Sequence, residues 1–298
     1  MDHEDSPMKT HLSPRELAMA IGVSESSLKR WADDGVIAAT RTAGGHRRIA
    51  RHEALRFIRQ TGQQVLRPQV LGFAESQEIP LTSDGSQDPA EALYDALLRG
   101  SRRETLGLVQ GWFLAGRALA WIFDGPMAVA MERIGQLWRC ESDGVLLEHC
   151  ATDLCIQAVT QLRLALPTEP SEAPTAVGAA LAGDPYLLPS LMAATVLQEV
   201  GFRAVNLGPQ TPLPVLAAAA LRHRAKLLWL SVSTEAAAGS AKAGLRRMAD
   251  ELEPIGTSLV IGGRASSLLA PLPQSNTTFA GGMAELAAFA KGLLAAAV

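Results

Sequence analysis

The stretch Lys226-Leu-Leu-Trp-Leu-Ser-Val232 is a continuous apolar run, typical of a strand buried on both faces of a parallel sheet. Similar runs recur on both sides of it, and helical patterns separate them. The runs cover residues 177–181, 203–207, 226–232, 258–262 and 277–280, and the helical stretches cover about 190–200, 213–223, 239–252 and 283–297. This rhythm predicts a five-stranded, doubly wound α/β domain of the flavodoxin-like, Rossmann type over residues 177–298. Its ligand site should lie at the carboxyl ends of the strands.

The preceding region, residues 89–166, has helical periodicity almost throughout. Breaks at Gly100, near Asp124-Gly125-Pro126 and at Ser142-Asp143-Gly144 divide it into four helices, which predicts a small four-helix bundle. Segments 71–88 and 167–176 are rich in Ser, Pro and acidic residues and are predicted to be linkers.

The N-terminal region differs from the rest of the chain in charge. Residues 8–70 contain 11 Lys and Arg against 5 Asp and Glu, whereas the residues from 71 onward contain 16 against 22. A basic end on an otherwise acidic chain indicates a polyanionic partner. Within it, Ser13 and Ser24 are candidate N-caps of two helices joined at Gly22. A hairpin around Gly44-Gly45 and a last helix follow, so residues 8–70 predict a winged helix-turn-helix.

The second helix and the hairpin supply the residues that we expect to contact DNA. Short polar and cationic side chains on an exposed helix face suit the major groove. A basic hairpin tip suits phosphates or the adjacent minor groove. The candidates are Ser26, Ser27, Lys29, Arg30, Arg41, His46, Arg47 and Arg48. A solvated basic face on an unrelated helical domain is the alternative interpretation.

The motif Ser27-Leu-Lys-Arg-Trp31, followed by Arg41-Thr-Ala-Gly-Gly-His-Arg-Arg-Ile49, resembles the MerR family of transcriptional regulators. The resemblance covers residues 11 to about 68. It implies a winged helix that binds double-stranded operator DNA as a homo-oligomer, either a dimer or a tetramer.

A second resemblance concerns the C-terminal part. Trp138, followed after nine residues by Glu148-His149, is similar to a signature of the cobalamin-dependent MerR-type photoreceptor repressors of the CarH/LitR type. The resemblance implies that Trp138, Glu148 and His149 form a roof over adenosylcobalamin. It also implies ligand contacts in the α/β domain from Asp184, Tyr186, Ser231, Ser233, Gly262 and Gly263.

The loop after the first strand of the α/β domain departs from that family. The family motif is D/E-x-H-x-x-G, in which the His is the lower ligand of cobalt. This chain keeps Asp184, but Tyr186 replaces the His and Pro189 replaces the Gly. A phenol, with a pKa of about 10, is a poor cobalt ligand compared with imidazole. Arg139 also stands where light-responsive members can have a His. Adenosylcobalamin is therefore a candidate cofactor, and another ligand or none is the alternative.

The sequence as a whole predicts a DNA-binding transcriptional regulator, more specifically a repressor, controlled by a ligand- or light-sensing module. One alternative is a cobalamin-independent MerR-type regulator that senses another small molecule or a protein partner. The other is a corrinoid-carrier enzyme subunit. No catalytic or metal-binding motif is present, so we expect no enzyme activity and no metal site of the protein's own. No secretory signal and no apolar run of about 18 residues is found, which predicts a cytoplasmic protein without a membrane partner.

Overall fold

The computed structural model describes residues 10–73, 88–137, 143–272 and 275–296. The chain forms two compact units. One comprises Met1–Ala118 and Val129–Pro167, and the other comprises Leu119–Ala128 and Thr168–Val298. No helix within the described residues is both long and apolar enough to cross a membrane.

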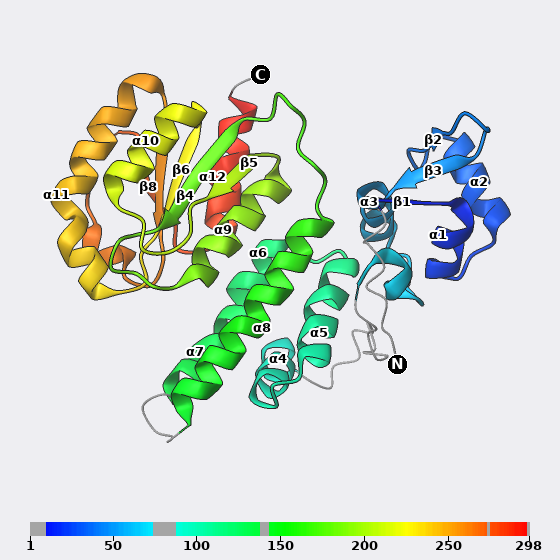
Figure 1. Ribbon diagram of the computed structural model, residues 1–298, viewed down its shortest axis with the longest axis horizontal. Coiled ribbons are helices and arrows are strands. Elements are labelled where there is room, and N and C mark those ends of the chain that lie inside the picture. Colours follow the sequence, from blue (N-terminus) through cyan, green and yellow to red (C-terminus); the bar gives the residue numbers. More distant parts are fainter. Residues whose placement is uncertain (1–9, 74–87, 138–142, 273–274, 297–298) are drawn as a thin grey trace. The chain divides into compact units, whose positions relative to one another are not determined.

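The second unit contains a five-stranded parallel sheet with the strand order β5-β4-β6-β7-β8 (Figure 1). The strands are β4 (Thr175–Ala180), β5 (Arg203–Asn206), β6 (Leu227–Ser231), β7 (Ser258–Gly262) and β8 (Thr277–Phe279). In the parallel register, Gly178 lies beside Trp229, and Ser231 lies beside Gly262. The predicted flavodoxin-like sheet is confirmed. Its order reverses between β4 and β6, where ligands of such sheets usually bind.

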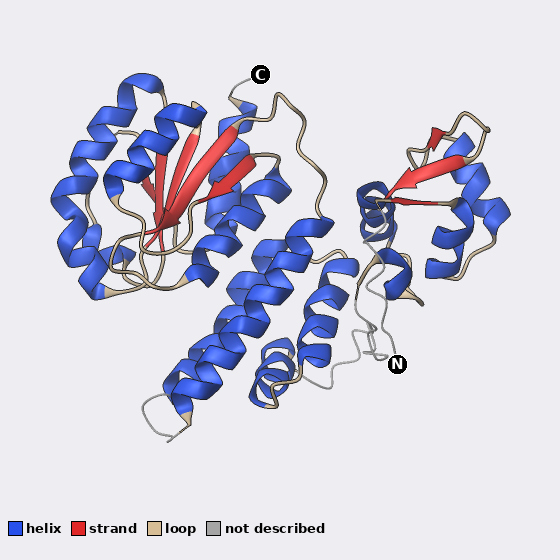
Figure 2. Ribbon diagram, in the orientation of Figure 1, coloured by secondary structure: helices blue, strands red, loops and turns tan. Residues whose placement is uncertain are grey.

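Helices cover both faces of this sheet (Figure 2). Helices α9 (Leu187–Val200) and α12 (Met283–Ala295) pack on one face, and α10 (Leu213–His223) and α11 (Glu235–Leu252) pack on the other. Two short 3₁₀ helices, η3 (Glu253–Ile255) and η4 (Ser266–Leu269), flank β7. Side chains of β6 alternate between the two cores: Leu228 and Leu230 face α10 and α11, whereas Trp229 faces α9 and α12. Because both faces are covered, the strand sequence is apolar throughout.

The helical region contains the predicted four helices, but one predicted break is wrong. The helices are α4 (Pro89–Leu98), α5 (Arg102–Leu114), a continuous helix from α6 (Leu119–Ile122) to α7 (Ala128–Leu137), and α8 (Gly144–Ala165). Instead of breaking at Asp124-Gly125-Pro126, the chain passes through a π-helical turn, Phe123–Met127. The wider turn tolerates Pro126, which has no N–H to donate. The actual break precedes α6, where Gly116 adopts a φ of +83°.

Asp124 also explains why the π-helical turn stays with the sheet domain. Its carboxylate accepts hydrogen bonds from the backbone N–H groups of Met283 (2.7 Å) and Ala284 (2.9 Å), at the start of α12. The N-cap residue of α12 is Gly282, which has no side chain to cap the helix. A carboxylate at this position satisfies free N–H groups and is stabilised by the helix dipole. Asp124 therefore acts as a remote cap for α12.

Residues 10–73 form helices around a small antiparallel sheet with the order β1-β3-β2. The elements are β1 (His11–Leu12), α1 (Pro14–Ile21), α2 (Glu25–Asp33), β2 (Thr40–Arg41), β3 (Arg47–Ala50), α3 (Arg51–Thr61) and the 3₁₀ helix η1 (Pro68–Leu71). Both predicted N-caps are confirmed: Ser13 forms a capping box with Glu16, and the Ser24 side chain accepts from the Ser27 amide. Gly22 ends α1 with a φ of +71°.

Two arginines of α3 connect this region to the helices of the same unit. Arg51 is buried, and its guanidinium donates to the carbonyl oxygens of Leu71 (2.6 Å) and Leu164 (3.3 Å). Leu164 lies in the last turn of α8, where carbonyls lack helical partners and carry the negative end of the dipole. Burial lowers the pKa of Arg51. Arg59 stacks on the Phe113 ring of α5, 4.0 Å from its centroid.

Replacing Arg51 by Met, which keeps an aliphatic chain but removes the donors, should lower the free energy of unfolding by about 2 kcal/mol, because hydrogen bonds from charged groups contribute about 1.5–3 kcal/mol. Urea unfolding followed by far-UV circular dichroism measures the change. Arg48→Met, at an exposed position, is the matched control and should change stability by less than about 0.5 kcal/mol. Equal effects of the two substitutions would contradict the structural role of Arg51.

Candidate functional site

Asp184 organises the loop that follows β4. Its side chain is fully buried, and its Oδ2 and Oδ1 atoms accept hydrogen bonds from the backbone N–H groups of Ser233 (2.5 Å) and Tyr186 (3.0 Å). Ser233 follows β6, so a single carboxylate connects the ends of two neighbouring strands. The backbone N–H of Gln210 donates to the backbone carbonyl oxygen of Asp184 (3.1 Å). The Gln210 side-chain oxygen accepts from the backbone N–H of Gly183 (2.7 Å). The loop is thus tied to the loops after β5 and β6.

Tyr186 and Pro189 belong to the start of α9. Tyr186 is the N-cap residue of α9, and 37% of the residue is exposed. Pro189 lies in the first turn, where a backbone N–H would have no helical partner, so the proline is compatible with the helix. Neither residue supplies an imidazole. The only histidine between residues 168 and 298 is His223, at the end of α10. Since α10 runs back along the sheet, His223 lies away from the carboxyl edge.

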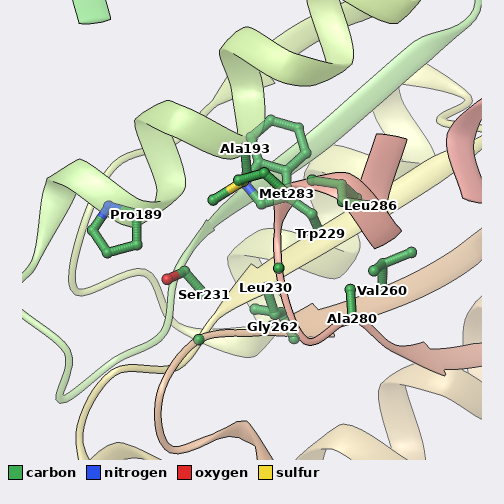
Figure 3. A pocket seen from close by; sticks show the side chains of 12 residues that line it. Pro189, Ala193, Trp229, Leu230, Ser231, Val260, Gly262, Ala280, Met283 and Leu286 are labelled. Carbon is green, nitrogen blue, oxygen red and sulfur yellow. The ribbon is translucent and has the colours of Figure 1, made fainter. Parts of the chain in front are cut away.

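A small cavity lies beside the carboxyl ends of β6 and β7, on the face that α9 and α12 cover (Figure 3). Its volume is about 70 Å³. The lining is mainly apolar and includes Ala193 from α9, Trp229 from β6 and Met283 from α12. Ser231 is the polar side chain that Figure 3 shows at this cavity.

The hydroxyl groups of Ser231 and Ser233 are buried and have no hydrogen-bond partner among the described residues. An unsatisfied buried hydroxyl costs about 1–3 kcal/mol, so a native structure rarely keeps one without a reason. Ser231 lines the cavity, and both residues lie where β6 ends at the switch point of the sheet. A ligand with amide or carbonyl groups at its edge would satisfy these hydroxyls.

Gly262 and Gly263 allow close approach between strand ends. Gly263 has a φ of +101°, and a Cβ atom there would lie 2.5 Å from the Val232 carbonyl oxygen. A Cβ atom at Gly262 would lie 3.2 Å from the Ala280 carbonyl oxygen. Both glycines line the cavity as well. The two glycines were expected to let the backbone approach a ligand. In this structure they let it approach neighbouring backbone, at Val232 and Ala280.

The residues expected at the helical side of the ligand site are only partly described. Glu148 and His149 lie near the start of α8, with His149 Nε2 3.7 Å from Glu148 Oε2. The His149 side chain is 74% exposed and that of Glu148 is 22% exposed. Trp138 and Arg139 lie outside the described residues. Two polar side chains are thus available for a ligand on α8.

The second candidate surface is formed by α2 and the β2–β3 hairpin. Leu28 is fully buried and the Trp31 ring packs against Phe57 at a centroid distance of 5.3 Å, which fixes the inner face of α2. The other side of the helix is polar. Ser26, Lys29 and Arg30 are exposed there, Ser27 is partly exposed, and Lys29 pairs with Glu25 at 2.8 Å.

Asp33 attaches the hairpin to the end of α2. Arg47 Nη2 donates to both of its carboxylate oxygens (2.6 and 2.7 Å), and Arg41 Nη2 lies 3.4 Å from Oδ1. The hydrogen bond from Arg47 holds the pKa of Asp33 below its ordinary value. Arg41 and Arg47 therefore fix the hairpin to the helix, whereas His46 and Arg48 remain exposed beside them. Sequence reasoning did not foresee this internal use of two arginines.

Comparison with known proteins identifies one part of the chain. Residues 89–163 match the family model described as the B12 binding domain, which supports cobalamin as the cofactor. A search of curated proteins finds no match.

Among solved structures, the monomethylamine corrinoid protein of Methanosarcina barkeri is 19% identical to this chain, with a TM-score of 0.52. The alignment covers 67% of this chain and 96% of that protein, and it shows a shared fold. The methanol:cobalamin methyltransferase complex MtaBC of the same organism is 16% identical over 79% of this chain and 88% of that one, with a TM-score of 0.37. A cobalamin-binding protein from Desulfitobacterium hafniense DCB-2 is 18% identical over 70% and 97%, with a TM-score of 0.34.

Cobalamin fits some features of the sheet domain and not others. The unsatisfied Ser231 and Ser233 hydroxyls suit the amide side chains that surround a corrin ring. No imidazole is available from this domain at the carboxyl edge, because its one histidine ends α10. The residues present therefore suit the edge of a corrin, but this domain offers no histidine that could bind the cobalt atom.

Gly178 makes room for Trp229, and a substitution there should test this packing. A Cβ atom at Gly178 would lie 2.1 Å from the Trp229 indole. Gly178→Ala should therefore lower the free energy of unfolding by about 1–3 kcal/mol through overpacking and alter the near-UV circular dichroism. Gly292→Ala in α12 is the control, since no atom lies within 4 Å of its Cβ position. The control should keep or gain stability.

The double variant Gly178→Ala/Trp229→Leu should be less destabilised than the sum of the two single variants, because the smaller Leu side chain no longer overlaps the new methyl group. If the two substitutions instead destabilise the protein additively, Gly178 is not the residue that accommodates Trp229.

Proposed function

We propose that this chain is a sequence-specific DNA-binding transcriptional repressor whose operator affinity is controlled by cobalamin bound to its C-terminal part. The observation that carries the proposal is the exposed polar and cationic surface of α2 and the hairpin, opposite the buried side of α2 at Leu28. A surface of this kind suits the major groove and the adjacent phosphates. The excess of basic residues in segment 8–70, against an acidic remainder, supports the same assignment.

In this proposal, residues 8–70 form a MerR-type winged helix-turn-helix and 71–88 a linker. Residues 89–166 form a four-helix bundle similar to a cobalamin cap, and 177–298 form an α/β domain of the cobalamin-binding type. The operator would be double-stranded DNA bound by a dimer or tetramer, since two-fold symmetry matches paired half-sites. The light response of the CarH/LitR type belongs to the same proposal.

The candidate DNA contacts divide into two groups. Ser26, Ser27, Lys29 and Arg30 would enter the major groove from α2, and His46 and Arg48 would contact phosphates or the minor groove from the hairpin. Arg41 and Arg47, which bond to Asp33, would instead hold the hairpin in position. Two contacts of α3 would carry a change in the helices to this surface: Arg51 with the end of α8, and Arg59 with α5.

Each unit contributes its own candidate residues for the corrin. In the helical unit these are Glu148 and His149 of α8. In the sheet domain, Ser231 and Ser233 would bind amide groups of the corrin, with Asp184 holding the Ser233 backbone in place. Bound adenosylcobalamin supplies a light-sensitive cobalt–carbon bond. The part of this chain is to orient the ring and to pass its presence to the α3–α8 contact.

Two other functions have specific support. The absence of a histidine at position 186 favours a cobalamin-independent regulator that senses another small molecule or a protein partner. The fold shared with a monomethylamine corrinoid protein favours a corrinoid carrier that presents methyl groups to a methyltransferase. The carrier function does not account for the cationic surface of residues 8–70, whereas the regulator does.

Arg30→Ala and Arg48→Ala should each weaken binding to a duplex that the full-length chain selects from a random-sequence pool, by about tenfold. Each should also reduce the slope of log K against log salt by about 0.9 if the lost contact is to a phosphate. Arg246→Ala, at an exposed position of α11, is the matched control and should bind as the unchanged protein does. Wild-type affinity in both test variants, measured by fluorescence anisotropy, would remove the assignment of this surface.

Adenosylcobalamin should remain with the protein through gel filtration and should change its affinity for the selected duplex by at least about fivefold, as ligand coupling usually does. The absorption spectrum and the same binding assay provide the two readouts. Retained corrin without any effect on DNA, together with methyl transfer from a methylated corrinoid, would support the carrier function. DNA binding without corrin uptake would support the cobalamin-independent regulator.

A further inference from the structure

The cavity beside β6 is closed on one side by a firmly held tryptophan. Trp229 is only 2% exposed, and its indole lies in the space that the missing side chain of Gly178 leaves on β4. The indole N–H donates to Ser190 Oγ (3.2 Å), and Ser190 in turn donates to Asn206 Oδ1 (2.9 Å). A ring with a fitted cleft and a hydrogen-bonded nitrogen has a single defined position. Trp229 is therefore a fixed wall of this cavity.

The remaining volume is too small for an aromatic base. The cavity measures about 70 Å³, whereas an engineered cavity of about 150 Å³ is what holds a single benzene ring in a protein core. Cobalamin carries a nucleotide tail that ends in a benzimidazole, which is larger than benzene. With Trp229 in place, the base has no room between the sheet and α9 and α12.

The sheet domain also gives cobalt no replacement for that base. When the base of a corrinoid leaves the metal, a protein side chain can take its place, and imidazole is the commonest metal-binding side chain. Residue 186 is a tyrosine, and His223, the one histidine of residues 168–298, ends α10. The steric constraint and the missing ligand are independent observations, and both disfavour a released base.

We infer that cobalamin bound to this chain keeps its own benzimidazole coordinated to cobalt, with the nucleotide tail outside the sheet, and that Trp229 is the residue that excludes the base. The inference rests on the proposed cobalamin binding. In this binding mode, Ser231 contacts the edge of the corrin and not the tail, and the tail contributes little to affinity. The chain would accept corrinoids that differ in their lower base, or that lack one.

The direct test is electron paramagnetic resonance of the reduced, Co(II) form of cobalamin whose benzimidazole is labelled with ¹⁵N, bound to the full-length chain and freed of excess by gel filtration. A coordinated base adds nitrogen splitting to the cobalt lines, and this splitting changes with the isotope. We expect the isotope-dependent splitting in the bound complex. Its loss on binding would overturn the inference while leaving the proposed cobalamin-dependent function intact.

Two variants then distinguish the steric effect of Trp229 from the effect of the missing histidine. Tyr186→His alone should keep the splitting from the labelled base, because Trp229 still blocks the cavity. Tyr186→His combined with Trp229→Ala should lose it, because the base then has room and cobalt has an imidazole. Loss in the single variant, or retention in the double variant, would show that Trp229 is not what excludes the base. Trp229→Leu serves in the same design where the alanine variant does not fold.

Affinity provides a readout that needs no variant. Dicyanocobinamide, which lacks the nucleotide tail, should compete with cobalamin at equal affinity. If the base were buried in the sheet, cobalamin would bind at least about tenfold more tightly than the tail-less corrinoid, because burying an aromatic ring contributes that much. Such a preference would overturn the inference. If neither corrinoid is retained, the proposed cobalamin binding itself fails, and this inference falls with it.

Discussion

The packing of the Trp229 indole against Gly178 is the constraint on which the C-terminal half depends. The ring packs on one face of the sheet near the switch point and donates a hydrogen bond to Ser190 at the start of α9. It also limits the size of the cavity that Ser231 lines. A smaller residue at position 229 would leave a deep pocket, and a larger one at 178 would displace the ring. The fold shared with a corrinoid protein is thus combined with a tryptophan that fills space between the sheet and α9 and α12. Proteins with one fold often differ in just this way, because function depends on the site and not on the architecture.

A small number of charged contacts also holds the N-terminal region together. Asp33 binds two arginines of the hairpin, and Arg51 reaches the carbonyls at the end of α8. In both contacts, a charged group joins two elements through more than one hydrogen bond. Such hydrogen bonds are directional, whereas apolar packing is not. The exposed cations that remain on α2 and the hairpin then have a defined position. Under the proposed function, a change in the packing of α8 would reach the candidate DNA-binding surface through the Arg51 contact.

Much of the fold could be predicted from the sequence because its signals are local. Apolar runs identify all five strands, and Ser13 and Ser24 identify two helix starts. The break expected at Asp124-Gly125-Pro126 is absent for reasons that the local sequence does not show. The Asp124 side chain caps α12, some 160 positions away, and a π-helical turn accommodates the proline. The site shows the same limit. Asp184 and Ser231 could be found by position, but Trp229 looks like any other residue of a buried strand. Only its pairing with Gly178 across two strands reveals that it fills the site.

The central claim is that residues 8–70 bind a specific duplex and that the rest of the chain controls this binding. The most direct measurement is competition: the full-length chain, bound to its selected duplex at fixed salt, is challenged with a scrambled duplex and with heparin. The account predicts that the selected duplex is held at least about 10³-fold more tightly than the scrambled one, as for specific regulators. Equal displacement by heparin, scrambled and selected duplex would mean that the cationic surface is a general polyanion site, and would contradict the account.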